Sequence, residues 1–203
     1  MKISATILAA GSSQRMNGNN KLLLPFKDKT LINAVCQTLI NSQLEPIFIV
    51  TGFENKKVSK SLPKSIDKII YNRNWSNGMG KSINKAIRSL PSNIDGNMIV
   101  LGDMPLITVR TINKLWKVFL QHDGNKIIYA DYLGKQANPV IFPKRFFDEI
   151  LHLDGDEGCK KIIEKNRKSS VDVSIDSSEV IFDCDTKEDY SDLISMKINN
   201  VKI

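Results

Sequence analysis

Apolar positions follow two different spacings along this 203-residue chain. Short continuous apolar runs alternate with segments whose apolar residues recur every three or four positions, which is the spacing of one helix face. The first run covers residues 3–10, and a helical pattern follows over residues 31–43, with Thr30 placed to cap that helix. This alternation is typical of βαβ units and predicts a mostly parallel sheet packed against helices.

The same alternation continues to residue 120. Further strands are predicted over residues 46–50, 67–71 and 98–101, and further helices over residues 54–62, 83–90 and 109–120. Pro63 and Pro91 directly follow two of these helices, and proline stops a helix because it has no amide hydrogen to donate.

The pattern changes in the second half of the chain. Two strands over residues 126–132 and 137–142, joined by a turn, predict a small antiparallel insertion. Helices over residues 144–153 and 156–165 and a last strand over residues 180–182 are predicted to follow. Thr186 is placed to cap a closing helix, with Asp189 three residues further on.

These elements predict an α/β protein with one doubly wound, mostly parallel sheet and helices on both faces. The length suits one sizeable core and is short for two. We therefore assign residues 1–195 to a single domain and residues 196–203 to a C-terminal tail. In such sheets ligands bind outside the carboxyl ends of the strands, so the loops that follow the strands are the candidate site.

Composition narrows the class of protein. The net charge of +7 and the pI of about 9.2 would suit a nucleic-acid partner, but the basic residues form no run of five and are not interleaved with aromatics. No apolar run reaches the roughly 18 to 20 residues that span a bilayer. Three distant cysteines and two histidines form no zinc motif. We expect no nucleic-acid or membrane partner, and reduced thiols in a cytoplasmic protein.

The most informative polar segment follows the first apolar run. Gly11 ends the run, and Ser12, Ser13, Arg15 and Lys21 follow in a loop of small residues. Backbone N–H groups of such a loop can bind an anion, while the arginine and lysine supply positive charge. The segment therefore predicts a polyphosphate site.

Other interpretations of this segment fail on spacing. A P-loop needs lysine directly after its second glycine, and a dinucleotide fingerprint needs three glycines within six residues; neither pattern is present. A secretory signal peptide is the remaining alternative. The apolar run is short for one, contains two hydroxyl side chains and leads directly into charged sequence.

Two acidic segments are candidate metal ligands. Asp103 follows a predicted strand, where Gly102 would leave space for a ligand, and a carboxylate there can hold Mg²⁺ together with phosphate oxygens. Asp183 and Asp185 are alternate residues and would share one face of an extended segment. With no neighbouring cation expected, a metal would relieve their repulsion. The alternatives are a helix-capping role for Asp103 and a capping box around Thr186 for the second segment.

Together these segments resemble the molybdenum cofactor cytidylyltransferase family. Residues 8–22 match the pattern L-A-A-G-x-S-x-R-M-x-G-x-x-K-L, and residues 102–106 match G-D-M-P-L. Residues 183–190 resemble the D-x-D-T-x-E-D-x ending of that family, with Lys187 where proline is usual. The resemblance extends over about residues 3–192 and implies a Rossmann-like nucleotidyltransferase fold.

Weaker matches complete the resemblance. Residues 72–82 resemble the N-x-x-W-x-x-G-M-x-x-S loop beside the nucleotide, with Lys81 where relatives often carry serine. Residues 137–140 resemble the G-N-P-V segment of the acceptor side, with Ala137 in place of glycine. Residues 153–160 resemble the L-x-G-D-x-G-x-K/R segment that faces the second substrate.

The resemblance implies an enzyme that transfers CMP from CTP to the molybdopterin form of the molybdenum cofactor and releases pyrophosphate. It implies catalytic roles for Arg15, Lys21 and Asp103, and Mg²⁺ held by Asp103 and Asp185. The substrate-binding residues that it implies are Leu8, Ala9, Ala10, Gly11, Ser12, Ser13, Lys21, Asn72, Gly78, Ser82, Gly102, Asn138 and Pro139. A molybdenum hydroxylase is the implied client enzyme.

Related activities remain as alternatives. They are a guanylyltransferase of the same cofactor, a cytidylyltransferase of isoprenoid synthesis, a sugar-phosphate nucleotidyltransferase, and a catalytically silent carrier of the cofactor. The guanylyl branch typically has glycine where Ala10 stands. The nucleophile in the favoured reaction is a phosphate, which needs no general base, and the motifs contain no histidine.

Overall fold

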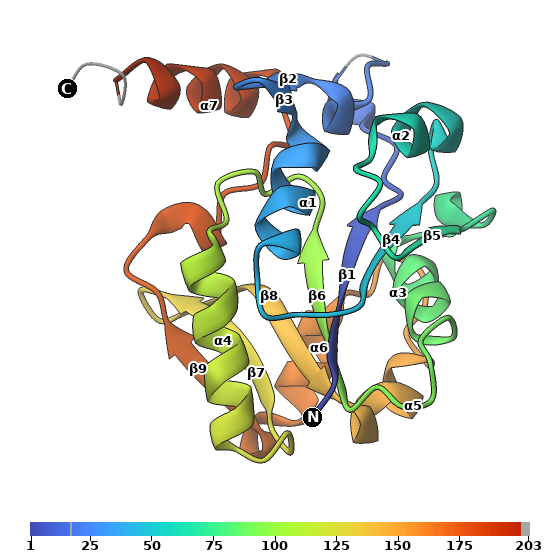
Figure 1. Ribbon diagram of the computed structural model, residues 1–203, viewed down its shortest axis with the longest axis vertical. Helices are drawn as coiled ribbons and strands as arrows, with labels where there is room; N and C mark the ends of the chain where they lie inside the picture. Colours follow the sequence, from blue (N-terminus) through green and yellow to red (C-terminus); the bar gives the residue numbers. More distant parts are fainter. Residues whose placement is uncertain (17, 200–203) are drawn as a thin grey trace.

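The computed structural model describes residues 1–16 and 18–199, and one sheet of seven strands organises them (Figure 1). The strand order is β5-β4-β1-β6-β8-β7-β9, and only β8 runs antiparallel to its neighbours in this sheet. The strands are β1 (Ile3–Ala9), β4 (Ile47–Thr51), β5 (Lys68–Tyr71), β6 (Gly96–Leu101), β7 (Ile127–Tyr132), β8 (Lys135–Pro143) and β9 (Ser170–Ser174). A separate small antiparallel pair is formed by β2 (Pro25–Phe26) and β3 (Lys29–Thr30).

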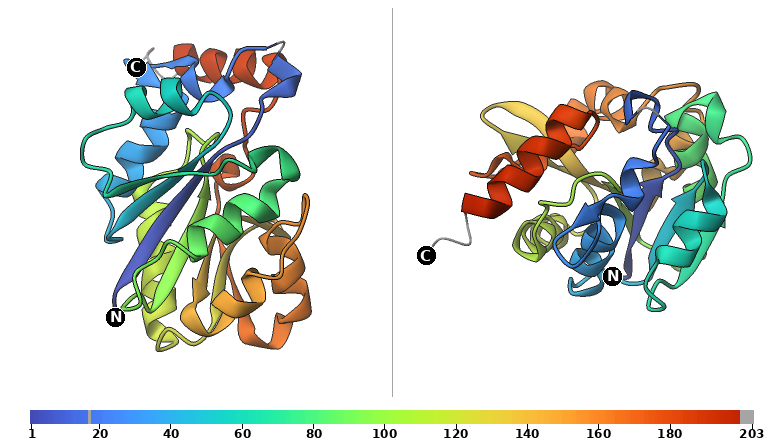
Figure 2. Two further views of the ribbon diagram at one scale, coloured as in Figure 1. Left: turned by 90° about the vertical axis from the view of Figure 1, so that its right-hand side faces the viewer. Right: turned by 90° about the horizontal axis from the view of Figure 1, so that it is seen from above.

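Helices cover both faces of the sheet (Figure 2). They are α1 (Leu31–Ile40), α2 (Asn55–Ser61), α3 (Met79–Ile87), α4 (Val109–Gln121), α5 (Phe147–Ile150), α6 (Cys159–Lys165) and α7 (Lys187–Asn199). The helices α1 and α4 pack on one face, and α3, α5 and α6 pack on the other. None of the helices in the described part of the chain has the length and hydrophobicity needed to cross a bilayer.

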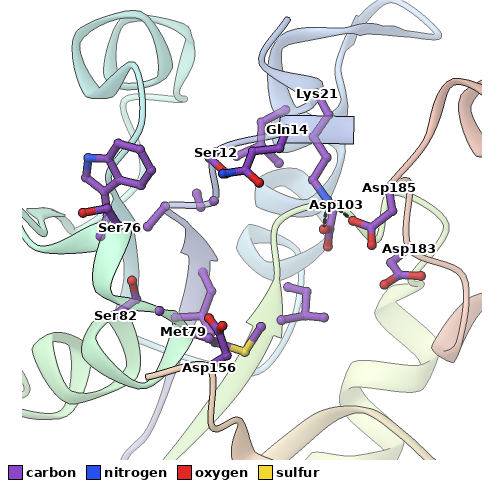
Figure 3. A pocket seen from close by; sticks show the side chains of 18 residues that line it. Ser12, Gln14, Lys21, Ser76, Met79, Ser82, Asp103, Asp156, Asp183 and Asp185 are labelled. Carbon is purple, nitrogen blue, oxygen red and sulfur yellow. Dashed lines mark hydrogen bonds and ion pairs between the residues drawn. The ribbon is translucent and has the colours of Figure 1, made fainter. Parts of the chain in front are cut away.

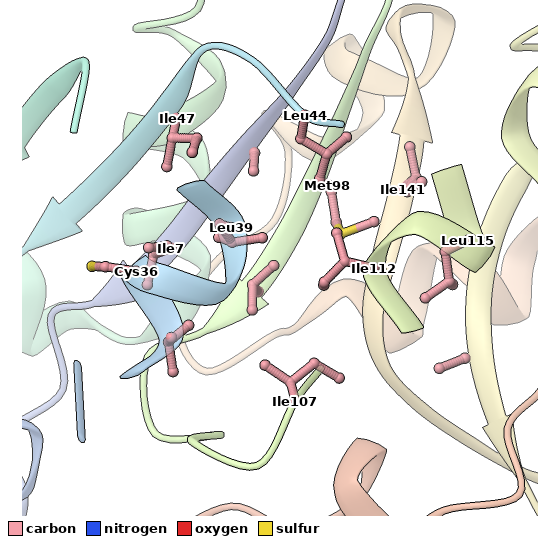
Figure 4. Close-up of a cluster of buried hydrophobic side chains, with 14 of the residues drawn as sticks. Ile7, Cys36, Leu39, Leu44, Ile47, Met98, Ile107, Ile112, Leu115 and Ile141 are labelled. Atoms are coloured by element: carbon pink, nitrogen blue, oxygen red, sulfur yellow. The ribbon is translucent and has the colours of Figure 1, made fainter. Parts of the chain in front are cut away.

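The core lies between the central strands and the helices on either side. On the face shown in Figure 4, Ile7 of β1 and Met98 of β6 meet Leu39 of α1 and Leu115 of α4, and all four are fully buried. Strands that are covered on both faces carry apolar residues at nearly every position. This explains why continuous apolar runs in the sequence predict the central strands.

Strand order places the candidate loops side by side. The chain passes from β1 to β4 and β5 on one side, then returns to β6 on the other side of β1. The loops that follow β1 and β6 therefore leave the carboxyl ends of neighbouring strands at the point where the strand order reverses. Proteins with α/β sheets of this kind bind ligands at such a point. The predicted fold class, including the antiparallel insertion, is confirmed.

Some predicted elements differ from the structure. The strand predicted over residues 180–182 is wrong, because a 3-10 turn at Ser178–Val180 ends there and residues 181–182 form no strand. The strand β9 was missed, since only two of its residues, Val171 and Val173, are apolar and most of it is partly or fully exposed. The helix α3 begins four residues before the predicted start at residue 83, in a polar segment that gives no apolar periodicity.

The closing helix α7 lies across the carboxyl end of the sheet, beside β2 and β3 (Figure 1). The predicted cap is confirmed: the Asp189 N–H donates to Thr186 Oγ1 at 3.1 Å, and the Thr186 N–H donates to Asp189 Oδ2 at 2.7 Å. The helix crosses the expected boundary between residues 195 and 196. Residues 200–203 of the expected tail lie outside the described residues.

Two contacts anchor α7. Leu193 is 1% exposed and belongs to a buried cluster with Phe26 and Leu31. The Tyr190 hydroxyl donates to the Pro25 carbonyl oxygen at 2.8 Å. Because α7 follows residues 183–185 directly, these contacts also constrain the acidic segment.

We predict that Leu193→Ala lowers the free energy of unfolding by about 2–4 kcal/mol, because it leaves a cavity where α7 meets the domain. Urea denaturation followed by circular dichroism measures this change. The control is Met196→Ala, since Met196 lies on the same helix and is 44% exposed. Equal stability of the two variants would contradict the anchoring role of Leu193.

Candidate active site

A pocket of about 540 Å³ opens at the carboxyl ends of β1 and β6 (Figure 3). The predicted residues that line it are Leu8, Ala9, Ala10, Gly11, Ser12, Lys21, Gly78, Ser82, Asp103 and Asp185. They come from four separate segments of the chain. The sheet topology thus brings the polyphosphate loop, the segment over residues 72–82 and both acidic segments to one place.

Lys21 lies between the two predicted metal ligands. Its ammonium group forms an ion pair with Asp103 and a second with Asp185, the latter at 2.5 Å between Nζ and Oδ1. The lysine side chain is only 11% exposed. Burial alone would lower its pKa, but the charges and hydrogen bonds of the two aspartates outweigh this effect and raise the pKa above its ordinary value. Lys21 is therefore firmly cationic.

Local hydrogen bonds fix the backbone from which Lys21 extends. The Lys21 N–H donates to Ser13 Oγ at 3.1 Å, and Ser13 has a positive φ of 53°. Asn20 accepts from the Leu22 N–H at 3.2 Å, and so caps the short 3-10 turn that contains Lys21. Ser13 does not line the pocket itself; in this structure it shapes the loop.

Arg15 reaches the same carboxylate from outside. Its Nη1 lies 2.7 Å from Asp185 Oδ2, while its side chain is 71% exposed. Such an exposed ion pair adds little stability. The expectation that the acidic segment has no neighbouring cation is wrong, because it was based on the local sequence and both cations come from the distant first loop.

No strand holds the second acidic segment. Asp183 and Asp185 nevertheless both line the pocket, because Cys184 between them is buried and its N–H donates to the Asp103 carbonyl oxygen at 2.9 Å. This hydrogen bond ties the segment to the chain that follows β6. Burial, together with the charges of Asp103 and Asp185, raises the pKa of Asp183.

The carboxylates of Asp103 and Asp185 have the chemistry of divalent metal ligands. Asp103 Oδ1 is buried and, within the described part of the chain, accepts no hydrogen bond, which leaves its lone pairs available. No cluster of three or more metal-ligating side chains is present among the described residues. Mg²⁺ needs only one or two carboxylates when phosphate oxygens and water complete its six ligands. The residues therefore fit a metal that is shared with a bound polyphosphate.

Other predicted residues lie behind the pocket wall. Asn72 is buried and donates from Nδ2 to Ser82 Oγ at 3.0 Å, so it orients a serine that lines the pocket. Gly102 lies outside the lining: a Cβ there would come within 2.9 Å of the Leu8 carbonyl oxygen and 3.0 Å of Ile32 Cδ1. The space that this glycine leaves is used by the end of β1 and not by the pocket.

Asn138 and Pro139 are also predicted residues outside the pocket lining. They lie on β8 and do not line this pocket. Val140 pairs with Ile99 of β6 in antiparallel register. Residues 138 and 139 therefore lie towards the carboxyl end of β6, along the sheet edge that carries the pocket.

Several lining residues were not among the predicted site residues. They are Gln14, Leu22, Trp75, Ser76, Met79, Leu101 and Asp156. Asp183 lines the pocket too, as expected for a residue that shares a face with Asp185. Trp75, Met79 and Asp156 stand at matched positions of the family patterns, so the resemblance contained a signal for them. Figure 3 shows Asp156 beside Met79, across the pocket from Lys21 and the other acidic residues.

Comparison with known proteins shows to which family this chain belongs. The profile of the MobA-like NTP transferase domain matches residues 5–171. Purine catabolism protein PucB of Bacillus subtilis is 29% identical over 194 residues, which cover 90% of this chain and 91% of that protein. Nicotine blue oxidoreductase of Paenarthrobacter nicotinovorans is 27% identical over 141 residues, which cover 68% of this chain and 66% of that protein.

Solved structures show the same fold. The crystal structure of Rv0371c from Mycobacterium tuberculosis H37Rv superimposes with a TM-score of 0.85 at 24% identity, covering 96% of this chain and 98% of that chain. A structure of Rv0371c in complex with manganese gives a TM-score of 0.82 at 22% identity, over 96% of this chain and 99% of that chain. This chain belongs to the MobA-like NTP transferase family and is a nucleotidyltransferase.

Proposed function

We propose that this protein transfers CMP from CTP to the molybdopterin form of the molybdenum cofactor and releases pyrophosphate. The observation that carries the proposal is Lys21, a buried cation held between Asp103 and Asp185. The pocket around it also contains the end of β1 and residues 10–11. Opposite charges in one partly buried site suit a substrate that brings phosphates and a divalent cation together.

In the proposed reaction, an oxygen of the acceptor phosphate forms a bond to the α-phosphorus of CTP. The bond from that phosphorus to the bridging oxygen breaks, and pyrophosphate leaves with the electron pair. Lys21 would neutralise triphosphate oxygens before and during this step, with Arg15 adding charge at the rim. Positioning and charge supply most of the acceleration, since a phosphate nucleophile needs no general base.

A divalent cation is the proposed cofactor, with Asp103 and Asp185 as its ligands from the protein. When bound, Mg²⁺ would neutralise the developing charge on the leaving pyrophosphate. The free lone pairs on Asp103 Oδ1 support this role. The manganese complex of Rv0371c supports a divalent metal in a protein of this fold.

The proposed preference for cytidine over purine nucleotides rests on Ala10, which lines the bottom of the pocket. Ala10 is 6% exposed, packs beside Phe48 and Val50, and also lines the pocket. Its methyl group would narrow the floor, so that a one-ring base fits and a purine is crowded. The Ala9-Ala10 pair is also the sequence that the family resemblance associates with a cytidine substrate.

The acceptor is proposed from the family resemblance in the sequence. The name of PucB refers to purine catabolism and that of the second relative to an oxidoreductase, and neither name states a transferred nucleotide. A molybdenum hydroxylase as client enzyme and a cytoplasmic location are parts of the same proposal. The three cysteines are free thiols, which supports a reducing compartment.

Pyrophosphate release tests the proposal. We predict release with CTP and Mg²⁺ only when the molybdopterin cofactor is present, with GTP, ATP and UTP used at least tenfold less well, because an ill-fitting base leaves buried polar groups unpaired. A coupled pyrophosphate assay with each nucleotide, with and without cofactor, measures this. Equal or better use of GTP would remove the cytidylyl assignment. If no nucleotide gives pyrophosphate release and the cofactor nevertheless binds tightly, the silent carrier is favoured.

We predict that Asp103→Asn and Asp185→Asn each lower turnover by about 10²-fold or more, because each removes a charge that holds the metal. Both variants should also bind Mn²⁺ more weakly in the presence of CTP, as measured by electron paramagnetic resonance. The control is Asp192→Asn, which removes an exposed carboxylate of α7. Full activity in both site variants would overturn the metal assignment.

A further inference from the structure

The first turn of α3 packs directly against residues 153–158, hereafter the 153–158 loop. The Gly80 N–H donates to the Gly155 carbonyl oxygen at 2.9 Å. One turn later, Asn84 Nδ2 donates to the Leu153 carbonyl oxygen at 2.9 Å. Two hydrogen bonds thus hold the backbone of the loop to a helix that lies about seventy residues earlier in the chain.

Two glycines make this contact a close one. A Cβ on Gly78 would overlap the carbonyl group of Gly155, and one on Gly80 would lie 3.1 Å from the Asp154 nitrogen. The backbones therefore touch without an intervening side chain. On the outer side, Lys81 pairs with Asp154 at 2.6 Å, but both side chains are well exposed and the pair contributes little.

The opposite side of the same turn forms the pocket wall. Met79 and Ser82 of α3 line the pocket, and so does Asp156 from the 153–158 loop. Figure 3 shows Asp156 beside Met79 and opposite the carboxylates that flank Lys21. Asp156 thus reaches the pocket from a loop whose place is set by α3.

We infer that Asn84 and Gly80 are positioning residues, which hold Asp156 in register with the nucleotide-binding wall. What the two sides bind rests on the proposed function: the nucleotide against α3, and the second substrate against the 153–158 loop. An ionised carboxylate only accepts hydrogen bonds, so Asp156 addresses an N–H, O–H or cationic group of that substrate. A nucleotide that orders the first turn of α3 also orders the loop, and the two substrates favour each other's binding by the same factor.

Two variants disturb this contact by different means. Asn84→Ala removes the donor to Leu153. Gly80→Ala inserts a methyl group against the backbone of Asp154. Alanine favours a helix more than glycine does. Any effect of Gly80→Ala therefore does not come from a weaker α3. The matched control is Lys85→Ala, which changes an exposed residue of the same helix.

The first measurement is amide hydrogen exchange in the protein without substrates. We expect the amides of the 153–158 loop to exchange about fivefold faster in Asn84→Ala and Gly80→Ala, and the Gly80 amide to do so in Asn84→Ala, which corresponds to the loss of one net hydrogen bond. Exchange in Lys85→Ala should match that of the wild type. Unchanged exchange in both site variants would overturn the positioning role.

The second measurement separates positioning from general destabilisation. In both variants the KM for the molybdopterin cofactor should rise about fivefold, while the dissociation constant of CTP changes less than twofold. An equal loss of affinity for CTP would contradict the inference, since it would show that the pocket as a whole is disturbed. Because the exchange measurement uses no substrate, a wild-type protein inactive with CTP and the cofactor would contradict the proposed function alone.

Discussion

The ammonium group of Lys21 joins three chain segments that lie far apart in the sequence. Asp103 follows β6, Asp185 precedes α7, and Lys21 extends from the loop after β1. Carboxylates gathered at one partly buried place repel each other, and a cation between them offsets that repulsion. Removing one member of such a set leaves charge uncompensated, which costs more than the pair contributes. The site is therefore built around this lysine.

The rest of the fold serves to bring these segments together. The central position of β1 puts its loop beside the end of β6, and the buried contacts of Leu193 hold α7 so that Asp185 reaches the same edge. On the other side of the pocket, Asn84 and Gly80 tie α3 to the loop that carries Asp156. Each wall of the pocket is thus set by packing outside the pocket.

The parts of the site that follow buried strands could be predicted from the sequence. Lys21 and Asp103 come after continuous apolar runs, and parallel strands end at the same edge of a sheet. The position of Asp185 followed from the family resemblance, but the strand predicted just before it was wrong. The segment is oriented by the hydrogen bond from Cys184 to Asp103 and by the ion pairs of Asp185. The ion pairs of Lys21 and the contact of Asn84 were not predictable, since they depend on how distant segments pack.

The role of Lys21 is tested most directly by calorimetric binding of CTP in the presence of Mg²⁺. We predict that Lys21→Ala weakens binding by about tenfold or more, because hydrogen bonds to charged groups contribute more than neutral ones. The exposed Lys56 of α2 provides the control variant, Lys56→Ala, which should bind CTP as the wild type does. Unchanged CTP affinity in Lys21→Ala would contradict a triphosphate site built around this lysine.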